Sequence, residues 1–126
     1  MKNLTKLTTL LVVDQIESAL PAWEALGYSV SVRVPESGVA GFVILKGPND
    51  SELMMQTRAS LSEDLPVVAR KKPSFLLYAD VTKLAKARQA LGQAKVLVEE
   101  RTTFYGARES WLELENAVIL GLSEHA

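Results

Sequence analysis

The residues best suited to chemistry lie near the C-terminus, in the stretch FYGARESWLELENAVILGL. Tyr105 either closes the turn before the strand that follows it or offers an amphipathic ring as a large contact area with little loss of conformational entropy. Arg108 either forms a salt bridge with Glu109 or Glu113 or clamps an anion. Trp111 shares a strand face with both glutamates and either lines a hollow or packs in a dimer interface. The stretch therefore predicts a binding surface.

A second group of candidate ligand contacts lies in the first half of the chain. Alternation along ELMMQT places Glu52, Met54 and Gln56 on one strand face, and a carboxylate, a thioether and an amide suit a partly polar organic molecule. Glu52 either begins this strand in solvent or, if buried, becomes a base with a raised pKa. Phe42 of the preceding strand is a further contact. Counting back from two aspartates gives an apolar floor of Leu7, Thr9, Leu11, Phe75 and Leu77.

The sequence lacks the residues that several other kinds of chemistry require. The sequence has no cysteine, which removes disulfides, thiolate nucleophiles and thiolate metal sites. Its one histidine, His125, is expected to be a solvated chain end. Serines such as Ser74 and Ser110 have no activating histidine, and glycine patterns that cradle phosphate are absent. We therefore predict no catalytic residue.

The composition is that of one compact domain. The chain has 126 residues, of which 48% are apolar, with 14 basic residues against 15 acidic ones. With a net charge of −1 and no long block of like charges, the sequence favours neither nucleic acid nor an anionic membrane as a partner. The apolar run Leu7–Val13 is too short to span a bilayer. We expect a cytoplasmic protein.

Hydrophobic periodicity predicts a strand, a helix and three strands in the first half. Leu7–Val13 has the composition of a strand, and Asp14 with Glu17 matches a capping box at the start of a helix. Pro21 is expected to bend this helix or shorten its first turns, and Gly27 ends it. The buried stripe of the helix is Ile16, Ala19, Leu20, Trp23 and Leu26. The strands that follow are Tyr28–Val34, Val39–Lys46 and Glu52–Thr57.

The second half repeats the first. LLVVD at 10–14 corresponds to LLYAD at 76–80, and Leu26–Gly27 corresponds to Leu91–Gly92. We predict the α+β class, with two tandem βαβββ modules over about 4–58 and 73–126 of a single domain and a polar linker over about 59–72. One helix covers only one face of each half-sheet, so we expect the halves to form a curved mixed sheet around a central cup. The elements predicted in the second half are a helix with Leu84, Ala87 and Leu91 in its stripe and strands at Val96–Thr102, Arg108–Glu115 and Ala117–Ser123.

The order of elements and one short motif resemble a known group of proteins. The motif is Tyr105, Gly106, Arg108 and Glu109, followed by Glu115–Ala117. Both resemble the vicinal oxygen chelate superfamily, which includes glyoxalases, bleomycin resistance proteins, fosfomycin-modifying enzymes and extradiol dioxygenases. The resemblance implies the fold of that group, a homodimer, and a ring at Tyr105 that stacks on a planar ligand.

Enzymes of this superfamily hold a divalent metal, and the resemblance assigns four positions to its ligands. Those positions fall here on Leu7, Pro73 or Ser74, Glu52 and Gly121. Of these side chains, only the carboxylate of Glu52 is an ordinary metal ligand. The resemblance therefore implies a cup that has kept its shape and holds neither a metal nor another cofactor.

Three functions follow as hypotheses. The first is a metal-free protein of the bleomycin resistance type, which sequesters a small hydrophobic or aromatic molecule in the cup. The alternative is a divalent-metal-dependent lyase or dioxygenase with Glu52 as one ligand. A dimeric interaction module without a ligand is the third, and it requires Trp111 to be buried between subunits. The predicted ligand contacts are Tyr105, Trp111, Phe42, Met54, Gln56, Glu52, Arg108 and Phe75.

Overall fold

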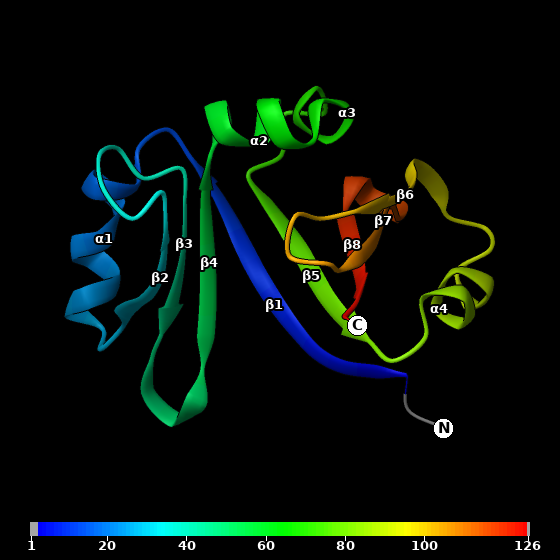
Figure 1. Cartoon of the computed structure of the whole chain (residues 1–126), viewed down its shortest axis with the longest axis horizontal. Helices are drawn as coiled ribbons and strands as arrows, with labels where there is room; N and C mark the ends of the chain where they lie inside the picture. Colours follow the sequence, from blue (N-terminus) through cyan, green and yellow to red (C-terminus); the bar gives the residue numbers. More distant parts are fainter. Residues whose placement is uncertain (1–2, 126) are drawn as a thin grey trace. The chain divides into compact units, whose positions relative to one another are not determined.

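The computed structural model describes residues 3–125. These residues form two compact units, one of residues 9–75 and one of residues 3–8 and 76–125. We call them the N-terminal unit and the C-terminal unit (Figure 1). Strand β1 (Leu4–Val13) contributes residues to both units. Among the described residues, no helix has the length and the apolar composition needed to cross a membrane.

The N-terminal unit contains a mixed sheet with one helix along one of its faces. Its elements after β1 are α1 (Ile16–Ala25), β2 (Ser29–Val34), β3 (Phe42–Lys46), the short 3₁₀ helix η1 (Pro48–Asp50), β4 (Glu52–Thr57), α2 (Arg58–Asp64) and α3 (Pro66–Ala69). The strand order is β2-β3-β4-β1, in which β1 and β4 are parallel and the other neighbours antiparallel. Figure 1 shows α1 lying along this sheet and α2 continuing from the end of β4.

An apolar stripe holds α1 against the sheet. Ile16 is fully buried in a cluster with Ala40, Val43, Leu45, Leu53 and Met55. Three further residues of the predicted stripe pack against this cluster, namely Ala19, Leu20 and Trp23. Leu26 does not, since it is 65% exposed. The prediction for Leu26 is wrong because the helix ends at Ala25 and the chain turns away at Gly27, whose φ is +102°.

The start of α1 differs from the predicted capping box. Gln15 precedes the first helical residue, and its side chain makes no capping hydrogen bond. The Glu17 carboxylate instead accepts a hydrogen bond of 3.1 Å from the backbone N–H of Ala40, and it lies 3.5 Å from the guanidinium of Arg33. The hydrogen bond from Ala40 holds the pKa of Glu17 below its usual value. Glu17 thus ties the helix to the loop after β2.

The segment predicted as a polar linker is helical. α2 begins after Thr57, whose Oγ1 accepts a hydrogen bond of 3.1 Å from the backbone N–H of Ser60 and so caps the helix. α3 begins at Pro66, a residue that suits the first turn of a helix. The residues at spacings of four and three along this segment are buried, namely Leu61, Leu65 and Val68. The segment therefore adds to the buried core of the N-terminal unit.

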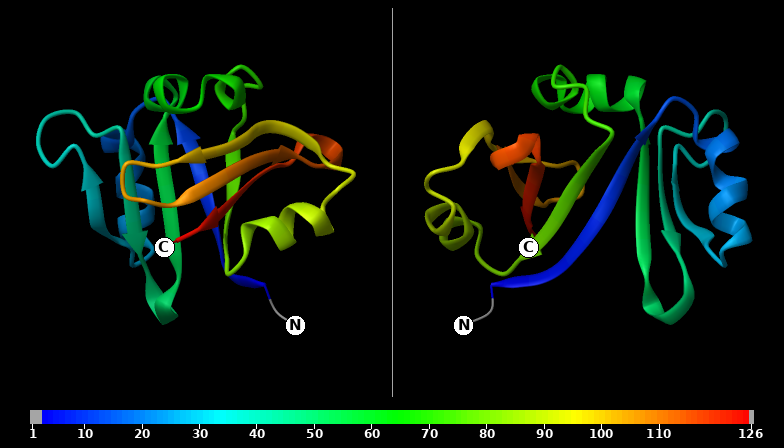
Figure 2. Two further views of the ribbon diagram at one scale, coloured as in Figure 1. Left: turned by 45° about the vertical axis from the view of Figure 1, so that its right-hand side comes forward. Right: turned by 180° about the vertical axis from the view of Figure 1, so that it is seen from behind.

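The C-terminal unit repeats the order of elements. Its elements are β5 (Phe75–Val81), α4 (Leu84–Ala90), β6 (Lys95–Thr102), β7 (Arg108–Glu113), the 3₁₀ helix η2 (Glu115–Ala117) and β8 (Ile119–Glu124). The strand order is β5-β8-β7-β6, with β5 and β8 parallel. Figure 2 shows β6 and β7 as a long antiparallel hairpin. α4 packs on a cluster of Ala79, Val81, Leu84, Ala87, Leu112 and Leu122.

The predicted α+β class and the repeated βαβββ order are confirmed. Each unit combines one parallel pair of strands with antiparallel ones, as a mixed sheet does. The largest errors in strand starts are at β1 and β3, which begin at Leu4 and Phe42, each three residues from the predicted start. Val39 is 80% exposed and follows Gly38, whose φ of +82° keeps the loop after β2 out of the sheet.

Candidate functional site

The sheet of the C-terminal unit has one face that α4 does not cover. Side chains alternate along a strand, so the neighbours of the residues under α4 point to this helix-free face. A first row across β5, β8 and β7 consists of Tyr78, Gly121 and Trp111. The next row consists of Asp80, Ser123 and Glu109. Aromatic and ionisable side chains thus gather on one side of the sheet.

The centre of this face is the carboxylate of Glu109, which is 2% exposed. Its Oε1 accepts hydrogen bonds from Arg101 Nε at 3.0 Å and from Trp111 Nε1 at 3.1 Å. Its Oε2 accepts hydrogen bonds from the hydroxyls of Tyr78 at 2.5 Å and Tyr105 at 3.2 Å. Arg101 also balances its charge, with Nη2 2.9 Å from Oε1. Because a buried carboxylate needs such partners, Glu109 fixes the positions of four side chains around it.

Trp111 is buried within the chain itself, with 2% of its surface exposed. Its indole lies over Gly121, where an added Cβ would stand 2.6 Å from the ring. The missing side chain at Gly121 lets the indole lie across β8, where its centroid is 6.1 Å from that of Tyr78. Trp111 is therefore not available as an exposed contact between subunits. The third hypothesis, a dimeric interaction module without a ligand, requires such a contact.

Tyr105 is the accessible ring of this cluster, with 53% of its surface exposed. Its hydroxyl lies 3.2 Å from that of Tyr78, in addition to its bond to Glu109. Its ring stacks on the imidazole of His125, with centroids 6.1 Å apart and planes inclined by 22°. The Nε2 of His125 lies 3.2 Å from Asp80 Oδ1. His125 is exposed, as the prediction of a solvated chain end requires, but its ring also contacts Asp80 and Tyr105.

Burial and the Glu109 carboxylate keep both tyrosines of the cluster protonated. Burial raises the pKa of the Tyr78 phenol well above its ordinary value, and the negative charge and hydrogen bond of Glu109 raise it further. Burial also raises the pKa of Tyr105. At neutral pH both hydroxyls are therefore hydrogen-bond donors to Glu109 and not phenolate bases.

Three predicted contacts lie on the helix-free face of the N-terminal unit. Phe42 stands opposite Gln56, and Met54 follows one step along β4 on the same face. Met54 and Gln56 are each 7% exposed, and Phe42 is half-buried. The Gln56 Nε2 donates a hydrogen bond of 3.1 Å to Ser60 Oγ. The structure brings these three side chains together as alternation predicted, and their contact with a ligand stays a prediction.

The other predicted contacts have partners of their own or lie at an edge. Glu52 is paired with Lys46, and its side chain is 11% exposed, so it is neither in open solvent nor a lone carboxylate. Phe75 is 43% exposed at the start of β5. Arg108 is paired with Glu100 at 2.9 Å and lies 3.7 Å from Glu124, not with the glutamates predicted from sequence.

The predicted apolar floor does not lie on the helix-free faces. Leu11 packs against the cluster under α1. Leu7 and Leu77 line a pocket of about 390 Å³ in the C-terminal unit, together with residues of α4. Counting back from the aspartates predicted the wrong face of β1. Leu10 and Val12 stand opposite Met54 and Gln56, so they, and not Leu7 and Leu11, lie on the helix-free face. Both faces of β1 are apolar, so composition alone does not distinguish them.

Sequence reasoning missed three members of the Glu109 cluster. Tyr78 appeared only as a letter of the repeat LLYAD, Arg101 was assigned no function, and Glu109 was only one of two possible partners of Arg108. Arg101 stands opposite Glu109 because β6 and β7 pair in a register that includes irregularities between Val96 and Arg101. The only sequence signal for the cluster was the concentration of tyrosine, arginine and glutamate around the hairpin.

Solved structures with the same fold cover almost the whole chain. A glyoxalase/bleomycin resistance protein/dioxygenase superfamily member from Vibrio splendidus 12B01 matches with a TM-score of 0.70 and 12% identity, over 96% of this chain and 98% of that one. A hypothetical protein from Bacillus halodurans C-125 matches with a TM-score of 0.72 and 15% identity, over 99% of this chain and 96% of that one. A glyoxalase I mutant from Zea mays matches with a TM-score of 0.59 and 11% identity, over 98% of this chain and 44% of that one.

No protein-family model matches the sequence, and no curated protein matches it either. The likeness to solved structures therefore identifies the fold alone. The chain has the vicinal oxygen chelate fold of the glyoxalase, bleomycin resistance and dioxygenase superfamily, as the sequence resemblance predicted.

The side chains present do not fit the divalent metal that this fold holds in its enzymes. Among residues 3–125, no three histidine, cysteine, aspartate or glutamate side chains form a group able to hold a metal ion. Glu52 is paired with Lys46. The position that the resemblance assigns to the last acidic ligand is Gly121, and the indole of Trp111 fills the space above it. The residues that the structure describes therefore do not provide the donors for a divalent metal of this kind.

Proposed function

We propose that the protein binds and sequesters a small planar aromatic molecule without a metal, and that the ligand stacks on Tyr105. The ligand's plane would lie on the helix-free face of the C-terminal unit, with its polar substituents near the tyrosine hydroxyls. Such a function needs neither a nucleophile nor a base, in keeping with the saturated carboxylate of Glu109.

The observation that carries this proposal is that the ring of Tyr105 is accessible and yet held in one orientation. An ordinary exposed tyrosine loses rotational freedom when a ligand stacks on it. Here the hydroxyl is already bonded to Glu109 at 3.2 Å and the ring is already stacked on His125. Binding therefore costs less entropy, which is how preorganisation favours affinity. Phe104 lies beside Tyr105 at the same turn, but it is 92% exposed, so its ring is less firmly oriented than that of Tyr105.

One further part of the proposal, the oligomeric state, rests on the resemblance of the sequence to bleomycin resistance proteins. We propose that the protein is a homodimer, which light scattering after size-exclusion chromatography tests directly. The predicted contacts Phe42, Met54 and Gln56 give the N-terminal unit an apolar face with one amide, which suits the same class of ligand.

A nuclear magnetic resonance titration tests the proposed site. The two tryptophans are expected to give separate indole N–H signals, which the variant Trp23→Phe would assign. The Trp111 indole N–H donates to Glu109. Naphthol, a planar probe, is expected to shift the Trp111 signal through the Tyr105–Glu109–Trp111 contacts and leave the Trp23 signal in place. Cyclohexanol, a non-planar alcohol, is the control. Equal shifts with both alcohols, or a shift of Trp23 alone, would refute the proposal.

A further inference from the structure

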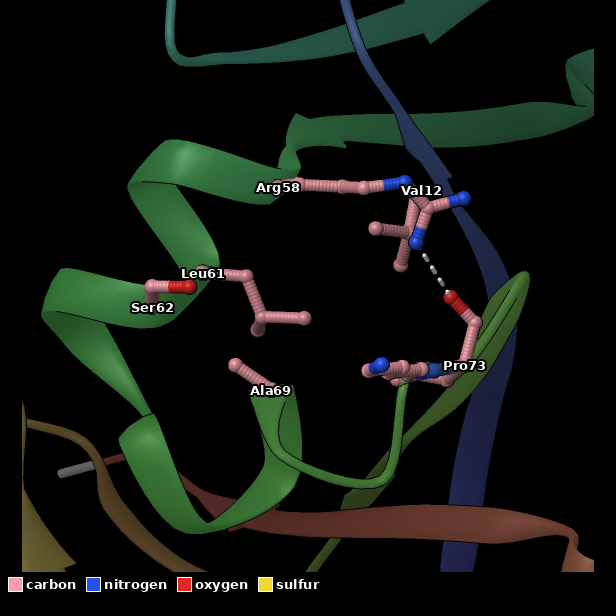
Figure 3. A pocket seen from close by; sticks show the side chains of 7 residues that line it. Val12, Arg58, Leu61, Ser62, Ala69 and Pro73 are labelled. Carbon is pink, nitrogen blue, oxygen red and sulfur yellow. Dashed lines mark hydrogen bonds between the residues drawn. The ribbon is translucent and has the colours of Figure 1, made fainter.

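A pocket of about 430 Å³ lies in the N-terminal unit, between the end of β1 and helices α2 and α3 (Figure 3). It is lined by Val12, Arg58, Leu61, Ser62, Ala69 and Lys72, with Pro73 beside them. Its volume lies within the range of sites that bind small molecules. None of these residues belongs to the Glu109 cluster, so the pocket is a separate feature of the molecule.

The floor of this pocket is apolar. Figure 3 shows the side chain of Leu61 projecting from α2 into the space that faces Val12 and Pro73, with Ala69 below it. Leu61 is 1% exposed and Val12 is 5% exposed, so their side chains present hydrocarbon to the pocket from fixed positions. A ligand here needs an apolar body.

The charged side chains that line the pocket are both basic. Arg58 is held in place because its Nε donates to Asp14 Oδ1 and its Nη1 donates to the backbone oxygen of Pro73, each at 3.1 Å. In residues 3–125, neither its Nη2 nor the ammonium of Lys72 has a hydrogen-bond partner. Asp14, the one carboxylate bonded to Arg58, has a side chain that is 88% exposed, so solvent screens it. The pocket therefore has positive charge available to a ligand.

We propose that this pocket is a second binding site, which takes a small carboxylate with an apolar body. The carboxylate accepts a hydrogen bond from Nη2 of Arg58 and pairs with Lys72, and the hydrocarbon part lies on Leu61, Val12 and Ala69. Two hydrogen bonds hold the guanidinium of Arg58 in place, and a hydrogen bond from its charged Nη2 to a carboxylate is roughly twice as strong as one between neutral groups. The segment from Arg58 to Pro73 has four basic and two acidic residues, so its charge also complements an anion.

Lys72 allows a test that leaves the fold intact. Its φ is +52°, in the left-handed region where asparagine is tolerated better than lysine. Lys72→Asn therefore removes the charge without a backbone penalty. Arg70→Asn is the matched control, because Arg70 is an exposed basic residue two positions away that does not line the pocket.

The experiment titrates the whole chain with hexanoate and follows its backbone amide spectrum. Hexanoate is expected to shift the amide signals of Val12, Leu61, Ser62 and Ala69. Hexanol, which lacks the charge, and phosphate, which lacks the apolar body, are expected to bind at least about tenfold more weakly. Lys72→Asn is expected to weaken hexanoate binding about three- to tenfold, and Arg70→Asn less than about twofold, since only Lys72 lines the pocket.

Three results would overturn the proposal. The first is that hexanoate leaves these amides unshifted, which means that the pocket is not a site. The second is that hexanol binds as tightly as hexanoate, which removes the anion preference. The third is that Arg70→Asn weakens binding as much as Lys72→Asn. The loss of affinity would then come from the overall positive charge of the segment and not from a contact inside the pocket. None of them bears on Tyr105, so the two sites stand or fall separately.

Discussion

The indole Nε1 of Trp111 donates a hydrogen bond of 3.1 Å to the carboxylate of Glu109, which precedes it by two residues on β7. Residues two apart on a strand share a face, so the bond keeps the indole flat against the sheet and over Gly121. The carboxylate that orients Trp111 also receives the hydroxyls of Tyr78 and Tyr105. The aromatic face of the C-terminal unit is therefore organised by one buried charge.

Glu109→Gln is expected to destabilise the protein by about 1–3 kcal/mol. The amide has one acceptor oxygen instead of two, and the substitution removes the negative charge that lies 2.9 Å from Nη2 of Arg101. Urea unfolding followed by circular dichroism measures the loss. Glu115→Gln, at an exposed glutamate of η2, is the matched control and is expected to change stability by less than about 0.5 kcal/mol. Equal stability of the two variants would show that the Glu109 cluster does not contribute to folding.

The stability of the protein is expected to fall as the pH rises above about 10, and Tyr78 is expected to be a main cause. Burial raises the pKa of Tyr78 in the folded state above that in the unfolded state. The stability that the buried phenol contributes is fully present below the pKa of the unfolded state. It decreases as the pH rises above that value, because the unfolded state then releases its proton and the folded state keeps it. Tyr78→Phe is expected to reduce the slope of unfolding free energy against pH by about 1.4 kcal/mol per pH unit in this range. Parallel slopes for the two proteins would contradict the burial of Tyr78.

Gly121→Ala is expected to destabilise the protein by about 1–3 kcal/mol, because a Cβ at this position would lie 2.6–2.7 Å from three atoms of the Trp111 ring. The smaller side chain of Trp111→Leu makes room for the methyl group. The double variant is therefore expected to be more stable than the sum of the two single changes predicts. Gly92→Ala is the control, since the nearest atom to its Cβ is 3.4 Å away. Additive effects of the two substitutions would mean that the ring does not lie over Gly121.

Much of the fold could be predicted from the sequence because periodicity is a local property. Ile16, Ala19 and Trp23 lie on one face of a helix wherever that helix packs, and the offset between LLVVD and LLYAD revealed the duplicated module. The helices α2 and α3 were missed although Leu61, Leu65 and Val68 have helical spacing. Pro66 and the polar residues between these positions are residue types typical of loops. In the structure the burial of the three apolar residues outweighs this local preference, and the segment is helical.

The candidate site could be predicted only in part because its centre depends on strand pairing. Tyr105 was found from its own motif, and Met54 and Gln56 from alternation along one strand. Arg101 meets Glu109 only through the register of β6 and β7, which has irregularities that the sequence does not indicate. Tyr78 reaches Glu109 from β5, 31 residues away in the chain. Arg108 was matched to its nearest glutamates, although the pairing of β7 with β8 places it opposite Glu124.

The affinity of naphthol for the wild-type chain and for two variants with one substitution each tests the central claim most directly. Isothermal titration calorimetry would compare the wild-type protein with Tyr105→Ala and with Phe104→Ala, which removes an even more exposed ring from the same turn. If the ligand stacks on the ring held by Glu109 and His125, Tyr105→Ala weakens binding at least about tenfold and Phe104→Ala less than about twofold. Equal losses in the two variants, or no loss in Tyr105→Ala, would contradict the account.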